Sequence, residues 1–223
     1  MALFALFTLV LAALGVVLLA KVFSIFQPGS RRIQEDLKKM KADMDKWASG
    51  LVPLTKEEVE LFSFNQEKQS IRKGLSRTAK GIFTSIYHEP VLAYSYKEYL
   101  GSGRNALLYA RTRSREYVYR FRKGNVEVSI NDKPVGVMKA DSVLYSGRSN
   151  RMLARVKRES DELLLPVLVN EREVGNVAKI DKGAKAKLGQ RAFEFVKEDM
   201  SPEEKEVFLS LGVLEVLEQS LSR

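Results

Sequence analysis

The segment VFLSLGVLEVL, residues 207–217, constrains the fold more than any other part of this sequence. Apolar side chains stand on nearly every side of the helix that it would form, so the helix has no face suited to water. Eleven residues are too few to cross a bilayer, which takes about 20. The rest of the protein must therefore enclose this helix, and we expect Phe208, Leu211 and Leu214 to lie in the core.

The start of this helix is marked by the residues in front of it. Ser201 can cap the first turn, Pro202 suits the first helical position, and Glu204 places an early negative charge at the positive end of the helix dipole. We expect the helix to cover about 203–219.

From about residue 81 onward, the apolar residues follow a period of two. Runs such as IFTSIY, VLAYSY and EYVYRFR are rich in β-branched and aromatic residues, and turn-like segments such as RKGN and NDKP separate them. Many short strands at close spacing indicate an antiparallel sheet that closes into a barrel or folds into a sandwich. Because the C-terminal helix needs cover on all sides, we expect a mainly β fold, an antiparallel β-barrel enclosing that helix.

One phrase occurs twice. VSINDKPVG at 128–136 returns as VLVNEREVG at 167–175, with each matched position keeping its chemical type. Asn131 and Asn170 suit tight turns because asparagine tolerates left-handed backbone, and Gly136 and Gly175 suit a bulge or a close approach of another chain segment. The repeat predicts one hairpin used twice, with a coincidence of two ordinary turns as the alternative.

The N-terminal region carries no charge between residues 2 and 20. A helix of 19 to 25 such residues is long enough for a hydrocarbon core, so we expect residues 1–26 to form a transmembrane anchor. A cleaved signal peptide would have a basic start and a shorter apolar core. Because the nearby basic side chains all follow the apolar run, the positive-inside rule predicts a single-pass protein with its N-terminus outside and its C-terminal domain in the cytoplasm.

Residues 27–52 form the expected juxtamembrane segment. Within it, apolar residues follow a heptad spacing among charged ones; they are Ile33, Leu37, Met40, Met44 and Trp47. We interpret residues 30–48 as an amphipathic helix that rests on its own domain or on the lipid surface. The alternative is a parallel dimer formed through the same residues. The folded β-barrel domain is then expected over 53–223.

The residue types present exclude several kinds of chemistry. The sequence has no cysteine and one histidine, which removes disulfides, sulfur-bound metals and most triads. His88 and Glu89 precede Pro90, as in an ordinary loop, and a general acid–base pair would need them to converge on a substrate in a pocket. We therefore expect no catalytic residues, no metal and no cofactor, and a protein that is not an enzyme.

The formal net charge is +9, and basic residues concentrate between Arg104 and Lys123. Within this run, alternation along two predicted strands pairs arginines on a common face, and paired guanidinium groups suit phosphate. The predicted ligand-binding residues for an anionic head group are Arg111, Arg113, Arg120 and Arg122. The alternative is a solvated barrel face. Nucleic acid is a less favoured partner that stays open, because the nearby aromatic residues could stack on bases.

The hairpin phrases, with Val-Gly at 135–136 and 174–175, and the candidate central helix in SPEEKEVFLSLGVLEVL together resemble the tubby-like domain over residues 53–223. That superfamily includes tubby proteins and the phospholipid scramblases. The resemblance is architectural and implies membrane-associated, non-enzymatic work such as lipid binding. The sequence departs from scramblases in the N-terminal place of its anchor and in lacking their proline-rich and cysteine-rich stretches.

Two functions follow as hypotheses. The first is a membrane-anchored binding module whose cytosolic basic barrel recognises anionic lipid or a phosphorylated ligand. The second is a membrane-tethered scaffold that dimerises through residues 30–48 and recruits a protein partner.

Overall fold

A computed structural model describes residues 2–26, 28–54, 56–74, 76–101, 103–158, 163–180 and 190–222. Its helices are α1 (Ala2–Phe26), α2 (Ser30–Ala48), α3 (Lys56–Val59) and α4 (Pro202–Leu221). Its strands are β1 (Phe62–Arg72), β2 (Thr78–Ser85), β3 (Pro90–Glu98), β4 (Ala106–Arg111), β5 (Glu116–Arg122), β6 (Asn125–Ile130), β7 (Lys133–Met138), β8 (Val143–Ser146), β9 (Met152–Val156), β10 (Leu164–Val169), β11 (Arg172–Ala178) and β12 (Phe193–Glu194).

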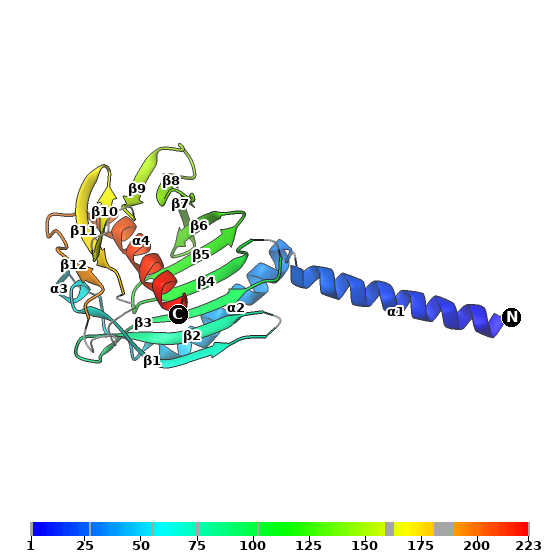
Figure 1. The fold of residues 1–223 in the computed structure, drawn as a ribbon. Coiled ribbons are helices and arrows are strands. Elements are labelled where there is room, and N and C mark those ends of the chain that lie inside the picture. The colour runs from blue at the N-terminus through cyan, green and yellow to red at the C-terminus, as the bar shows by residue number, and fades with distance from the viewer. Residues whose placement is uncertain are drawn as a thin grey trace.

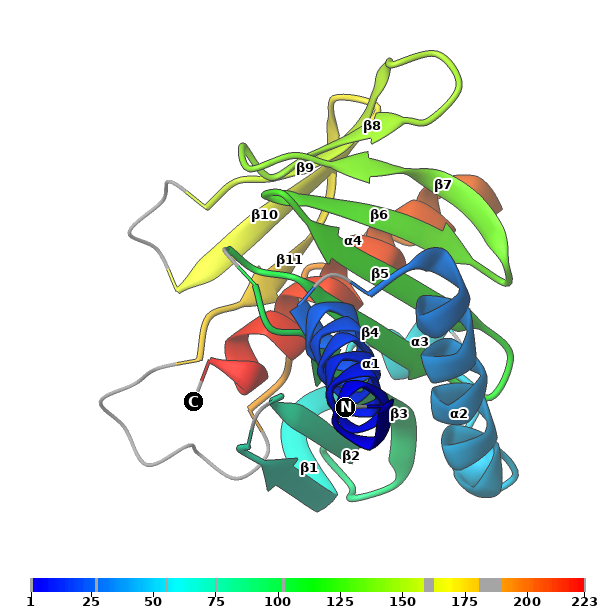
Figure 2. The ribbon, with the colours of Figure 1, turned by 90° about the vertical axis from the view of Figure 1, so that its right-hand side faces the viewer.

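The strands form one antiparallel sheet in which each strand pairs with its neighbours in the sequence. The sheet curls around α4, as Figures 1 and 2 show. Its two ends meet where Ser63 forms a bridge with Arg191 and where the N–H of Ala192 donates to the Phe62 carbonyl over 2.8 Å. The expected antiparallel barrel with a C-terminal helix is therefore confirmed as a nearly closed barrel, an architecture consistent with the tubby-like domain.

The strands alternate between an inner and an outer face. On β5, for example, Tyr117, Tyr119 and Phe121 are buried and belong to the core around α4, while the residues between them are less covered. This alternation follows from the pleat of a strand, which sends successive side chains to opposite faces. The inner face supplies the cover that the all-apolar helix requires.

Helix α4 runs through the barrel and is buried over most of its length. Phe208, Leu211 and Leu214 are at most 1% exposed. The Phe193 ring packs against Phe208 with ring centroids 5.7 Å apart, and it lies so close to Gly212 that a side chain there would overlap it. The helix begins with a capping box in which Ser201 and Glu204 satisfy each other's backbone N–H groups.

The repeated phrase forms the same hairpin twice, as β6–β7 and β10–β11. Each turn has two residues with positive φ, 49° and 63° in the first and 48° and 67° in the second, the pattern of a type I′ turn. The strand register of each hairpin also shifts at the same place, next to the pair Val128–Gly136 in the first and Val167–Gly175 in the second. Gly136 lies against the Tyr145 carbonyl and Gly175 against the Phe208 ring, so each glycine permits a different close approach.

Helix α2 lies on the outside of the barrel, against β3 and β4 (Figure 2). Its heptad residues pack on the outward side chains of the sheet, in a second apolar cluster that includes Leu107 and Tyr109. Asp36 on this face is 7% exposed. Its carboxylate accepts one hydrogen bond from Lys97 Nζ over 2.7 Å and another from the Tyr99 hydroxyl over 2.8 Å. The amphipathic helix therefore rests on its own domain, which is one of the two placements expected from the sequence.

Helix α1 projects away from the barrel (Figure 1). Its described apolar side chains are exposed, from Phe4 at 74% to Leu19 at 70%. Across the described part of the chain, however, no helix combines the length and the apolar character that crossing a membrane requires. The helix predicted within residues 1–26 is found at Ala2–Phe26, and its membrane-spanning character is not confirmed.

Candidate functional site

The four predicted arginines do not form one surface. Arg111 ends β4 and pairs with Glu116 at the start of β5, whereas Arg120 and Arg122 stand at the far end of β5. Arg120 and Arg122 lie four and six residues beyond Glu116 on β5, roughly 14 and 20 Å at about 3.4 Å per residue. A single head group therefore contacts one pair or the other.

The pair at the first end offers little to a ligand. Arg111 lies under α2, 14% exposed, and forms an ion pair with Asp45 of that helix. Arg113 is exposed in the turn after β4, so the expected alternation of the two residues along one strand is wrong. The reason is that the strand ends at Arg111 and the chain turns toward β5.

The other end contains a groove of about 680 Å³, within the range of small-ligand sites, roughly 300–1,000 Å³. Its walls come from the turn between α1 and α2, the β3–β4 loop and the β5–β6 hairpin, which lie together at the α1 end of the barrel in Figure 2. We call it the basic groove because the residues that line it include four basic residues and one acidic residue, which are Arg104, Arg120, Arg122, Lys123 and Glu127.

Two of these cations are fixed by the protein. Arg120 donates from Nη1 to the carbonyls of Ala106, over 2.9 Å, and Phe121, over 2.7 Å. Its burial lowers the pKa of the guanidinium, and the Tyr99 and Glu127 groups oppose that shift. Arg104 stacks on the Phe121 ring, 3.8 Å from its centroid, and forms an ion pair with Glu218 of α4.

The other two cations are directed to solvent. Arg122 and Lys123 are exposed at the β5–β6 turn, and within the described residues neither makes an ion pair or a side-chain hydrogen bond. Lys123 has a φ of 51°, a left-handed conformation in which asparagine or glycine is more usual. The groove therefore presents two positive side chains that have no ion-pair partner among the described residues.

The start of α2 adds a third positive element. Its N-cap is Gly29, which has no side chain to cap the helix, and its first turn contains no acidic residue. The N–H groups at a helix start carry partial positive charge and favour an anion. Pro28, Gly29 and Ser30 line the groove, so this helix end faces the same space as the arginines.

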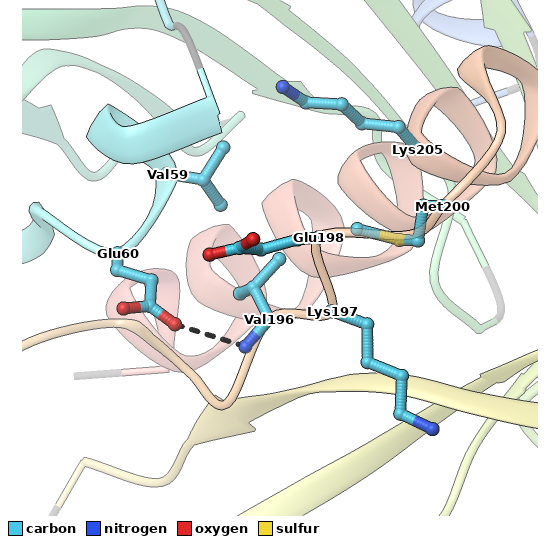
Figure 3. A pocket seen from close by; sticks show the side chains of 7 residues that line it. All are labelled: Val59, Glu60, Val196, Lys197, Glu198, Met200 and Lys205. Carbon is cyan, nitrogen blue, oxygen red and sulfur yellow. Dashed lines mark hydrogen bonds between the residues drawn. The ribbon is translucent and has the colours of Figure 1, made fainter.

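A second hollow lies at the opposite end, where α4 begins (Figure 3). It is smaller, about 300 Å³. Glu60 and Glu198 balance Lys197 and Lys205 on its walls, and Glu60 accepts the N–H of Val196 over 3.1 Å. Because its acidic and basic residues are equal in number and the Glu60 carboxylate already accepts a backbone hydrogen bond, this hollow is the weaker candidate for a charged ligand.

His88 lies in the exposed turn between β2 and β3, with a φ of 63°. The neighbouring Glu89 carboxylate accepts from the Ser85 hydroxyl over 3.4 Å, so it serves the turn. Among the residues that the structure describes, no three histidine, aspartate or glutamate side chains gather as metal ligands.

Sequence reasoning included Arg104 and Lys123 in the basic run, but it did not select them as ligand-binding residues. It also missed Glu127 and the turn before α2. The strand register would have found Glu127, since this residue pairs directly with Arg120. The contribution of the α1–α2 turn depends on how α2 packs, which no local pattern predicts.

Comparison of the chain with known protein families, with curated proteins and with solved structures finds no match. The geometry of the groove is therefore the main guide to function.

Proposed function

We propose that this protein is a membrane-anchored, non-enzymatic binding module of the tubby-like superfamily, and that its basic groove takes the phosphate of an anionic head group. The observation that carries the proposal is the meeting of Arg120, Arg122 and Lys123 with the uncapped start of α2 in one groove. Guanidinium, ammonium and helix N–H groups are the donors that phosphate prefers in proteins.

The place of the groove supports a ligand at a membrane surface. Helix α1 exposes apolar side chains along its described length, and an apolar surface of that kind calls for an apolar partner. We propose that lipid is this partner, with residues 1–26 as anchor and the barrel in the cytoplasm. The groove lies directly after α1, so head groups would be the nearest source of phosphate.

The scaffold hypothesis receives less support. The heptad residues of α2, such as Met40 and Met44, are buried against the barrel. A dimer through residues 30–48 would require α2 to leave that site.

The proposal is tested with the full-length protein in a non-ionic detergent, titrated with mixed micelles that contain phosphatidylglycerol. We expect binding that weakens as salt rises, because exposed charges are screened over about 8 Å at physiological ionic strength. The double variant Arg122→Gln/Lys123→Gln should lose up to about 2 kcal/mol, roughly thirtyfold in affinity, since each basic residue near an anionic surface contributes about 1 kcal/mol.

The matched control is Arg113→Gln/Arg148→Gln, which removes the same charge from exposed sites outside the groove. Equal loss in both double variants would show that net charge alone attracts the micelles and would overturn the groove. A single-stranded oligonucleotide serves as competitor, and its preferential binding would favour nucleic acid instead.

A further inference from the structure

The basic groove contains one carboxylate, that of Glu127. Its negative charge would repel a ligand that carries only negative charge. Glu127 is exposed on β6 and lines the groove beside the cations. It stands directly opposite Arg120 in the β5–β6 pairing. Opposite charges in that position usually pair.

Glu127 nevertheless makes no ion pair or hydrogen bond within the described residues. The reason lies in Arg120, whose Nη1 donates to the carbonyls of Ala106 and Phe121. Arg120 acts on Glu127 through its charge while its Nη1 donates to the two carbonyls, so the Glu127 carboxylate keeps its oxygens available to accept hydrogen bonds from a ligand.

The spacing between the cations Arg122 and Lys123 and the Glu127 carboxylate indicates the size of ligand that could contact all three. Arg122 pairs with Asn125, and Glu127 lies two residues further along the same outer face of β6. Diagonal neighbours of this kind are roughly 7–8 Å apart. An anion held by Arg122 and Lys123 therefore has a carboxylate within the reach of a short linker.

We infer that the basic groove binds a phosphate ester carrying a primary amine, with phosphoethanolamine as the chemical class. This inference rests on the proposed function, since it assigns the phosphate to Arg122 and Lys123. The ammonium donates hydrogen bonds to Glu127. A bare phosphate ester leaves that carboxylate beside the ligand without a donor, and like charges then oppose binding.

The walls also discriminate between amines. Quaternary ammonium groups are held in proteins by aromatic cages. None of the described residues that line the groove is aromatic. Phosphocholine offers Glu127 no N–H donor and finds no ring to cover its methyl groups, so a primary amine is favoured.

The test uses the full-length protein in a non-ionic detergent and isothermal titration calorimetry. The probes are O-phosphoethanolamine, sn-glycerol 3-phosphate and phosphocholine. We expect O-phosphoethanolamine to bind about tenfold more tightly than the other two, since one hydrogen bond between charged groups is sufficient for a decade in affinity. Glu127→Gln should remove this preference while keeping the binding of glycerol phosphate.

Glu67→Gln is the matched control, because Glu67 is exposed on β1 and outside the groove. It should keep the preference, and both variants should melt at the temperature of the wild type. Vesicles with phosphatidylethanolamine or phosphatidylcholine in a phosphatidylglycerol background then identify the source. A difference between the vesicles indicates a lipid head group, and a preference seen only with the free probes indicates a soluble ligand.

The outcomes separate the two proposals. Absence of binding by any phosphate probe would overturn the proposed function together with this inference. Equal affinity for the three probes, tighter binding of phosphocholine, or a preference that survives in Glu127→Gln would overturn the inference alone.

Discussion

Helices α4 and α2 pack on opposite faces of the barrel sheet, α4 on the inner face against β9, β10 and β11, and α2 on the outer face against β3 and β4. Helix α4 lies inside and buries residues on every side of its axis, while α2 lies outside and buries one row. Both helices also form ion pairs: α2 through Asp36 with Lys97 and Asp45 with Arg111, and α4 through Glu215 and Glu218 with Arg158. For these two helices, the number of apolar sides matches the number of sides that the barrel covers.

The largest expected effect tests whether a buried charge is more destabilising on the helix inside the barrel than on the helix outside it. Leu211 of α4 and Met44 of α2 are equally buried, at 1% and 0%. Leu211→Asp places a carboxylate where the barrel surrounds it, and burying an unpaired charge costs several kcal/mol against a total stability of about 5–15 kcal/mol. We expect no cooperative unfolding transition in circular dichroism.

Met44→Asp is the matched change on the outer helix. Here α2 can detach and expose the carboxylate to water while the barrel keeps its core. We expect a β-rich spectrum and a cooperative transition at a lower temperature. If both variants lose the transition, the barrel depends on α2 as much as on α4, and the contrast between the helices fails.

The sequence predicted α4 better than α2 for a physical reason. A helix that is apolar all round needs enclosure whatever encloses it, so the strands and the helix together implied the barrel. A single apolar row only requires a partner, and lipid, a second copy or the barrel wall would each satisfy it. Local spacing cannot choose among them.

The basic groove was less predictable than the barrel. It joins residues near position 29 with others near 104 and 122, and such distant segments meet only through strand register and the packing of α2. The sequence predicted strand alternation correctly on β5, where Arg120 and Arg122 share the outer face. It could not show that Arg120 donates to backbone carbonyls and gives Glu127 no hydrogen bond.

A smaller effect is expected from the buried acid of the outer helix. Asp36→Asn removes the partner of Lys97 and weakens the acceptor of the Tyr99 hydroxyl. Breaking a fully buried pair costs about 3–5 kcal/mol, but Lys97 is 24% exposed and recovers some hydration. We expect a loss of about 2 kcal/mol in the free energy of unfolding, measured by urea titration.

Asp43→Asn is the control for this variant, since Asp43 is on the same helix and its ion pairs are exposed. It should change stability by less than about 1 kcal/mol. Equal losses from the two variants would show that the buried pair adds nothing beyond a surface pair.

The smallest effect concerns the buried acid of the inner helix. Burial raises the pKa of Glu215, although Arg158 donates to its carboxylate over 2.8 Å and opposes the shift. A raised folded pKa means that the folded protein binds the proton more tightly than the unfolded chain does. This contribution to stability is fully present below the unfolded pKa, about 4.3, and is lost as pH rises through the folded value.

Glu215→Gln removes that pH dependence and, because Arg158 keeps Glu218 as a partner, should leave stability at neutral pH within about 1 kcal/mol of the wild type. Urea unfolding across the acidic range measures both. A fall in stability of several kcal/mol at neutral pH would mean that the ion pair outweighs the cost of burial, and that the inner helix depends on its charges as the outer helix does.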